Sequence, residues 1–150
     1  MATPYSDIFT RFLRKINDDL YNVLTVEESE DDLIGIMESS FMMVKFPRTD
    51  ITKRSNTTKE FVYDLPEKLQ ELISVAMKYE WAGRQIVRIE NTRQKFTEGD
   101  FKLTSQANHL EKLLLMQDQC DKELSRKTMK RSYSTTSGQA NWGGLAGGAQ

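Results

Sequence analysis

Apolar side chains recur every three or four residues along most of the chain, and this period is typical of amphipathic α-helices. The first such stretch starts at Ser6, a residue type favoured at helix N-termini, and predicts a helix over about residues 6–22. The next starts at Thr25 and Glu28, which form a capping box, and stops before Pro47, which cannot continue a helix interior. The first third of the chain is therefore predicted to form two amphipathic helices.

Two longer helices are predicted in the rest of the chain. Pro66 in a first turn and the apolar residues after it predict a helix over about residues 65–82. Gly83 should kink or interrupt this helix before a further stretch to about residue 96, because glycine costs ~1 kcal/mol relative to alanine in a helix interior. The cleanest period of the chain follows and predicts a helix over about residues 105–130.

The last helix carries an apolar seam whose members are separated by steps of four and three residues. They are Leu103, Ala107, Leu110, Leu114, Gln117, Asp121 and Leu124, with Leu113 and Cys120 beside them. Because Gln117 and Asp121 are polar, we expect the second half of this helix to leave the core and to meet water or a partner. A basic cluster, which the helix dipole favours at a C-terminus, ends the helix: Arg126, Lys127, Lys130 and Arg131.

Together these stretches predict an all-α fold, a small helical bundle of about four to five helices with a long extended arm and an extended Gly-rich C-terminal tail. With 150 residues the chain is long enough for one ordinary domain, which we assign to residues 1–131. We expect its core to contain the large apolar side chains of three helices: Phe9, Phe12, Ile16, Leu72, Ile73, Met77, Trp81, Leu110 and Leu114.

The arm comprises residues 48–63, which are rich in threonine, asparagine and charge and show no helical period. These residues predict either a long excursion or a loose two-stranded arm. Long connections in domains tend to be functional or disordered. We therefore expect the arm to project from the bundle and to contact another subunit, another protein or DNA.

Residues 132–150 form the tail, which contains five of the eight glycines of the chain. Such a segment cannot bury enough apolar surface to offset the entropy of ordering it, so it is predicted to be flexible on its own. Trp142 and Leu145 are spaced like anchors within it. We therefore interpret the tail as a docking segment for another molecule, in preference to the alternative of a spare linker.

The charges of the whole chain balance, with 21 Lys and Arg against 22 Asp and Glu. This balance argues against a protein that grips nucleic acid over its whole surface. Lys53 and Arg54 in the arm, together with the basic cluster, could still touch DNA phosphates without reading bases. No apolar run is long enough to span a membrane and no secretory leader is visible, so we expect an intracellular, soluble protein.

The sequence offers no constellation that carries catalysis or metal binding. One cysteine and one histidine exclude an internal disulfide framework and the usual zinc sites. His109 lacks a partner motif, Cys120 is expected to be a small packed side chain in mid-helix, and the acidic run at 27–32 lacks the order of a calcium loop. No glycine-rich phosphate loop opens a helix. We therefore predict no catalytic residue, no cofactor and no metal site.

Three segments resemble the small helical neck proteins of tailed bacteriophages, the head-to-tail connector or adaptor family. They are IFTRFLRKI near the start, YEWAGRQIVRIENTRQ in the middle and GDFKLTSQANHLEKLLL after it. The order of these features carries most of the resemblance. An apolar helix ends at Glu80 and Trp81, and farther along the chain the pair Asp100 and Phe101 precedes the run SQANHL. The resemblance covers most of residues 5–130, and the tail lies outside it.

The resemblance implies a structural virion subunit that is made in the host cytoplasm and placed at the neck of the virion. Such subunits form a homo-oligomeric ring, expected to be dodecameric, between the portal protein and the tail or tail-terminator protein. The ring passes double-stranded DNA without sequence specificity. A ring requires heterologous contacts, for which the acidic helix start after Thr25 and the basic cluster are suitable opposites. Partner contacts are accordingly expected at Lys53, Arg54, Arg126, Lys127, Lys130, Arg131, Trp142 and Leu145.

Two other interpretations remain open. The first is a head or tail assembly factor that leaves before the virion is complete. The second, which has least support, is a small helical enzyme. Purified virions separate a connector, which stays in them at a ring-like copy number, from an assembly factor, which is absent from them.

Overall fold

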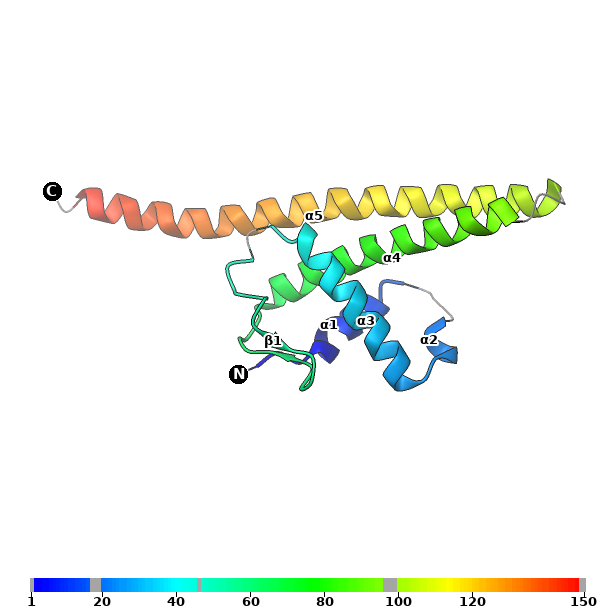
Figure 1. Ribbon diagram of the computed structural model, residues 1–150. Helices are drawn as coiled ribbons and strands as arrows, with labels where there is room; N and C mark the ends of the chain where they lie inside the picture. The colour runs from blue at the N-terminus through cyan, green and yellow to red at the C-terminus, as the bar shows by residue number, and fades with distance from the viewer. Residues whose placement is uncertain (1, 17–19, 46, 96–99, 149–150) are drawn as a thin grey trace.

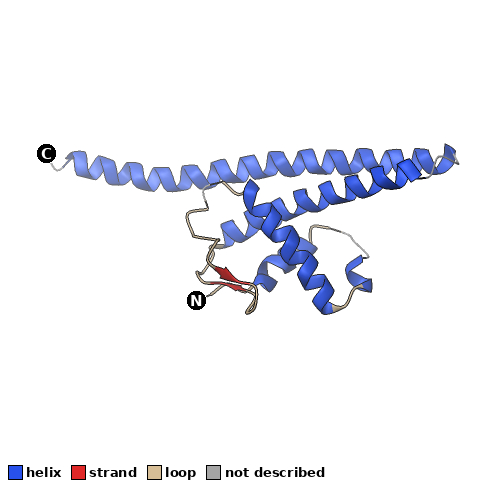
Figure 2. Cartoon of the chain, viewed as in Figure 1, coloured by secondary structure: helices blue, strands red, loops and turns tan. Residues whose placement is uncertain are grey.

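A computed structural model describes the backbone over residues 2–16, 20–45, 47–95 and 100–148, and the side chains over residues 2–16, 21–45, 47–91 and 107–131 (Figure 1). Its elements are α1 (Tyr5–Leu13), α2 (Leu20–Val23), α3 (Val26–Ser40), the 3₁₀ helix η1 (Phe41–Met43), β1 (Arg54–Ser55), β2 (Glu60–Phe61), α4 (Glu67–Lys95) and α5 (Asp100–Gly148). Helices dominate, with one short two-stranded sheet (Figure 2). The expected all-α fold is confirmed.

The central element is α4. Along one side of it α5 runs antiparallel, so that the two form a long helical hairpin, and α1 and α3 pack against α4 from the other side (Figure 1). Between residues 69 and 77, every side chain of α4 except that of Glu71 is buried. Such all-round burial is typical of a helix that has neighbours on both sides.

Most of the expected core is confirmed. Six of its nine members are buried: Phe9, Phe12, Leu72, Ile73, Met77 and Trp81. Ile16 and Leu110 are partly buried. The expectation for Leu114 is wrong, because its side chain is 49% exposed and that of Leu113, 3% exposed, is buried instead. Consecutive leucines satisfy the helical period in more than one register, and only packing against α4 selects one of them.

The capping box at the start of α3 is confirmed. The hydroxyl of Thr25 accepts a hydrogen bond from the backbone N–H of Glu28 (3.3 Å), whose carboxylate accepts one from the N–H of Thr25 (3.0 Å). At its other end α3 stops at Ser40, earlier than Pro47 alone would require. The hydroxyl of Ser40 donates to the carbonyl of Met37 (2.6 Å), and such a local bond competes with the helical ladder.

The single helix expected over residues 6–22 is corrected to two, α1 and α2. At the end of α1 the N–H of Lys15 donates to the carbonyl of Phe12 (2.9 Å), a bond that tightens the last turn. Lys15 also forms an ion pair with Glu71 of α4 (2.7 Å). The end of α1 therefore coincides with a tertiary contact, which the spacing of apolar residues along the sequence does not reveal.

The break expected at Gly83 is also corrected, since α4 is helical from Glu67 through Lys95. A β-carbon on Gly83 would lie 3.2 Å from Nε2 of Gln117, so glycine allows α4 and α5 to approach closely here. Buried apolar side chains flank the glycine on both sides: Trp81, Ala82 and Ile86. Their packing outweighs the weak helix propensity of one glycine.

The arm forms a two-stranded hairpin, one of the two expected forms, with Arg54 opposite Phe61. The expectation that it projects from the bundle is wrong. Phe61 is fully buried, and its ring centre lies 5.1 Å from that of Tyr5 and 6.1 Å from that of Phe41. Burial of this ring and of Ile51, together with backbone hydrogen bonds from Tyr5 to Lys59 and from Phe61 to Thr3, thus holds a mainly polar segment against the body.

The backbone of α5 continues to Gly148, beyond the end expected near residue 130. Adding a residue to an existing helix is far cheaper than starting one. Each glycine destabilises a helix by ~1 kcal/mol relative to alanine, so the glycines weaken this part of α5 without ending it. Trp142 and Leu145 lie outside the described side chains, so their role as anchors stays a prediction.

Candidate functional site

A recess of about 400 Å³ lies where α1, the start of α4 and α5 meet. It is lined by Arg11, Glu67, Lys68, Glu71, Leu72, Lys127, Lys130 and Arg131, and we call this surface the basic recess. Five of these side chains are cationic and two are carboxylates. The recess therefore carries a surplus of positive charge, although the charges of the whole chain balance.

Within the basic recess, Glu71 connects three helices by ion pairs. Its Oε1 atom lies 2.7 Å from Nζ of Lys15 and 3.0 Å from Nζ of Lys127, and its Oε2 atom lies 3.7 Å from Arg11. Burial disfavours the charged form of Glu71, but hydrogen bonds from both lysines and their positive charges outweigh this, so its pKa is lowered. The carboxylate stays ionised at neutral pH and ties α1 and α5 to α4.

Two cations of the basic recess are oriented by contacts with the fold. Nζ of Lys127 also lies 2.9 Å from Glu123. Burial opposes the charge of Lys127, but hydrogen bonds to Glu123 and Glu71 outweigh this effect, so its pKa is raised. Arg131 donates a hydrogen bond to the carbonyl of Pro47 and so links α5 to the segment after α3. Burial, and then the charge of a neighbouring arginine, lowers the pKa of Arg131.

The structure brings most of the sequence-predicted basic cluster together with residues that the sequence pattern missed. Three members of the cluster line the recess: Lys127, Lys130 and Arg131. Arg126 is exposed on α5 and does not line it. The pattern missed four other charged lining residues: Arg11, Glu67, Lys68 and Glu71. No spacing along the chain signals them, because they belong to helices that meet α5 only in the folded protein.

Lys53 and Arg54 of the arm lie outside the basic recess. Nζ of Lys53 is 5.8 Å from the ring centre of Tyr63. The guanidinium of Arg54 lies over the ring of Phe41 (4.9 Å) and donates to Oε1 of Glu38 (3.2 Å). Arg54 therefore holds the hairpin against the end of α3, while Lys53 remains exposed.

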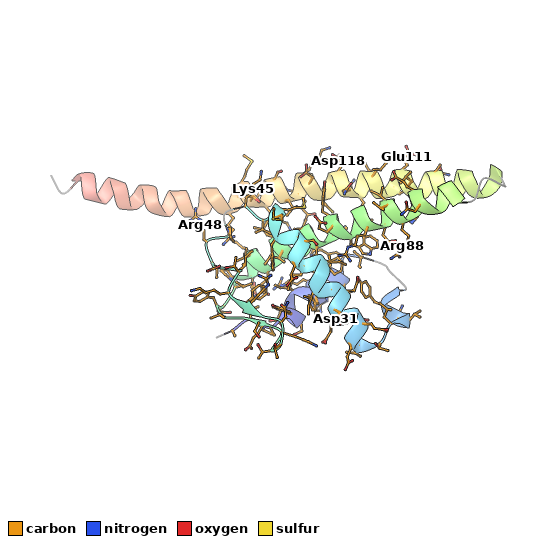
Figure 3. All side chains as sticks on the ribbon, in the orientation of Figure 1. Asp31, Lys45, Arg48, Arg88, Glu111 and Asp118 are labelled. Atoms are coloured by element: carbon orange, nitrogen blue, oxygen red, sulfur yellow. The ribbon has the colours of Figure 1, made fainter. Side chains whose placement is uncertain are left out.

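The first turns of α3 carry an acidic patch, by which we mean the exposed side chains of Glu27, Glu28 and Asp31. Two neighbouring acids are engaged inside the molecule, since Glu30 pairs with Lys59 and Asp32 pairs with Arg84. Figure 3 shows Asp31 on the part of α3 that is turned away from α5, whereas Lys45 lies near α5. The acidic patch and the basic recess thus occupy different parts of the body.

Reactive side chains are not concentrated at the basic recess. His109 is exposed on α5, and Cys120 is buried, which raises the pKa of its thiol. Over the described residues, no group of three or more His, Cys, Asp or Glu side chains is placed to hold a metal ion. In the part of the chain that the structure describes, no helix combines the length and the apolar character needed to cross a membrane.

The chemistry of the basic recess suits an anionic group, because ammonium and guanidinium donors form short, charge-assisted hydrogen bonds with carboxylates and phosphates.

Comparison with protein-family models, curated proteins and solved structures finds no significant match for this chain.

Proposed function

We propose that this chain is a structural subunit of the head-to-tail connector of a tailed bacteriophage. In this proposal, copies of the chain form a ring, expected to be a dodecamer, between the portal protein and the tail or its terminator protein. The ring belongs to the neck of the virion, and double-stranded DNA passes through it without sequence-specific contact. The role requires no catalytic residue and no cofactor.

The observation that supports this proposal is where the resembling segments lie in the fold. IFTRFLRKI forms α1 and the turn after it, YEWAGRQIVRIENTRQ lies in the second half of α4, and DFKLTSQANHLEKLLL opens α5. Both α1 and α5 pack against α4. All three resembling segments therefore lie on the helices that build the bundle.

The elongated form of the subunit is also suited to a ring. At one end, the hairpin of α4 and α5 extends beyond α1 and α3, and at the other end α5 passes the start of α4 (Figure 1). Neighbouring subunits in a ring meet through two different surfaces. A subunit with a projecting hairpin and two surfaces of opposite charge offers such surfaces.

Purified virions of the phage that encodes the chain test this proposal. We expect the protein in them at a ring-like copy number, and we expect electron microscopy to show rings with an open centre of DNA width. A knockout should accumulate DNA-filled heads that do not join tails. If the protein is required for assembly but absent from virions, it is an assembly factor and the proposal fails.

A further inference from the structure

We propose that the basic recess binds the carboxylates of the acidic patch, Glu27, Glu28 and Asp31, of a second copy of this chain. This inference rests on the proposed function, because the contact joins one subunit to the next. It goes further by naming the two surfaces that meet and the side chains that recognise each other.

The basic recess has positive charge that is not used inside the molecule. Glu71 already accepts from Lys15 and Lys127. Lys68 and Lys130, in contrast, are exposed, and no ion pair among the described residues engages either of them. Two exposed ammonium groups beside a concave surface are suited to carboxylates from another molecule, because opposite charges across an interface fix its register.

The acidic patch carries more negative charge than its cationic neighbour Lys59 balances, since Lys59 acts on Glu30, Asp31 and Glu27 together. Glu27 and Asp31 lie four residues apart on α3, so their like charges repel across one turn of the helix. The nearby Lys59 is already paired with Glu30. A cation supplied by a second molecule would relieve this repulsion.

The acidic patch and the basic recess lie too far apart on the fold to meet within one molecule, so a contact between them must join two molecules. The acidic patch lies at the start of α3, away from α5, and the basic recess lies between α1, the start of α4 and α5 (Figures 1 and 3). A contact between two different surfaces of identical chains is heterologous. Repetition of such a contact closes a ring when the rotation between copies permits it.

The lining of the basic recess favours protein carboxylates over the phosphates of DNA. Glu67 and Glu71 lie among its cations, and Leu72 adds apolar surface. A glutamate side chain, unlike a phosphate, can bury its methylene groups against Leu72 while its carboxylate meets the cations.

Charge reversal tests the two surfaces separately. One variant carries K68E and K130E in the basic recess, and the other carries E27K and D31K in the acidic patch. All four side chains are exposed, so both variants should fold, which circular dichroism can verify. In sedimentation experiments at low salt, self-association of each variant alone should be at least about tenfold weaker than that of the unchanged chain.

Mixing the two variants should restore association to within about threefold of the unchanged chain. In the mixture, the unchanged acidic patch of one variant meets the unchanged basic recess of the other, and the two reversed surfaces meet in turn. A matched control reverses an exposed pair on another part of α5, with E111K and K112E. This control should associate like the unchanged chain.

A chain that remains monomeric at all concentrations, or whose association ignores these reversals, overturns the inference. Loss of duplex-DNA binding in the K68E and K130E variant with unchanged self-association also overturns it, because the recess is then a phosphate site. The proposed function fails by a different result, the absence of the protein from virions. If virions contain the protein but the reversals have no effect, the connector role stands and another surface joins the subunits.

Discussion

The two halves of α4 are held in very different ways. Up to Ala82 the helix is covered by α1 and α3 on one side and by α5 on the other, and most of its side chains are buried. Beyond Gly83, among the described side chains, Ile86 is buried while Val87 is 55% exposed. Stability is therefore concentrated where the helices meet, and the rest of the hairpin depends on its seam with α5.

The largest effect is expected at Trp81, in the well-covered half of α4. W81A should lower the free energy of unfolding by about 3–5 kcal/mol, because it removes buried apolar surface and leaves a cavity. Chemical denaturation followed by circular dichroism measures this. The control L114A removes an exposed side chain and should change the free energy of unfolding by less than about 0.5 kcal/mol. Equal effects of the two substitutions would contradict the proposed position of the core.

A similarly large effect is expected in the arm, which belongs to the same well-packed region. F61A should lower the free energy of unfolding by about 3 kcal/mol, because the ring of Phe61 is fully buried. Deletion of Thr49 to Thr58 should also destabilise the monomer strongly, since it removes the buried Ile51. V62A, at an exposed position, is the control for denaturation. A deletion variant with full stability would support a projecting arm instead.

A smaller, pH-dependent effect is expected at Glu71, which ties α1 and α5 to the well-covered half. Because folding lowers its pKa, Glu71 contributes stability above the ordinary pKa of a glutamate, and this contribution is lost as the pH falls through the lowered, folded value. E71Q should therefore lower Tm at neutral pH and approach the unchanged chain in acid. E67Q is the control and should change Tm little at any pH. A difference in Tm that is independent of pH would count against this role of Glu71.

A still smaller effect is expected at Gly83, where the two halves of α4 join. G83A gains up to about 1 kcal/mol of helix propensity, part of which is lost because the new β-carbon crowds the amide of Gln117. That amide is the end of a flexible side chain, so we expect slight net stabilisation in denaturation experiments. G83V should destabilise, because a branched side chain cannot fit the same gap. A marked loss of stability in G83A would show that the approach of α4 and α5 is rigid.

The smallest effect on stability is expected at the end of α5, far from the covered half of α4. Truncation after Ser137, or W142A, should leave the free energy of unfolding of the monomer unchanged. Under the proposed connector role, attachment to DNA-filled heads should nevertheless fall, because a docked tryptophan can contribute more than about 2 kcal/mol to binding. Heads that carry a normal complement of the truncated protein would contradict a docking role of the tail.

The sequence by itself determined most of the helical segments and much of the core, although not where each helix ends. The capping box of Thr25 and Glu28 acts within one turn, so its signal is complete in four neighbouring residues. The apolar period identified the buried faces that contain Phe12 and Ile73. The basic cluster was also visible, because charges on successive turns of one helix are close in sequence. These features depend on local interactions, which spacing along the chain records.

Only the tertiary structure decided the basic recess, the place of the arm and the register of α5. Arg11, Lys68 and Lys127 come from three helices, and they share one recess because those helices pack together. Phe61 is buried against the rings of Tyr5 in α1 and Phe41 in η1. On α5, Leu113 is buried where Leu114 was expected, and Leu114 is exposed. Each of these outcomes depends on how close segments that are remote in sequence come to one another. Burial and ion pairing depend on those distances, and the spacing of residues along the chain does not specify them.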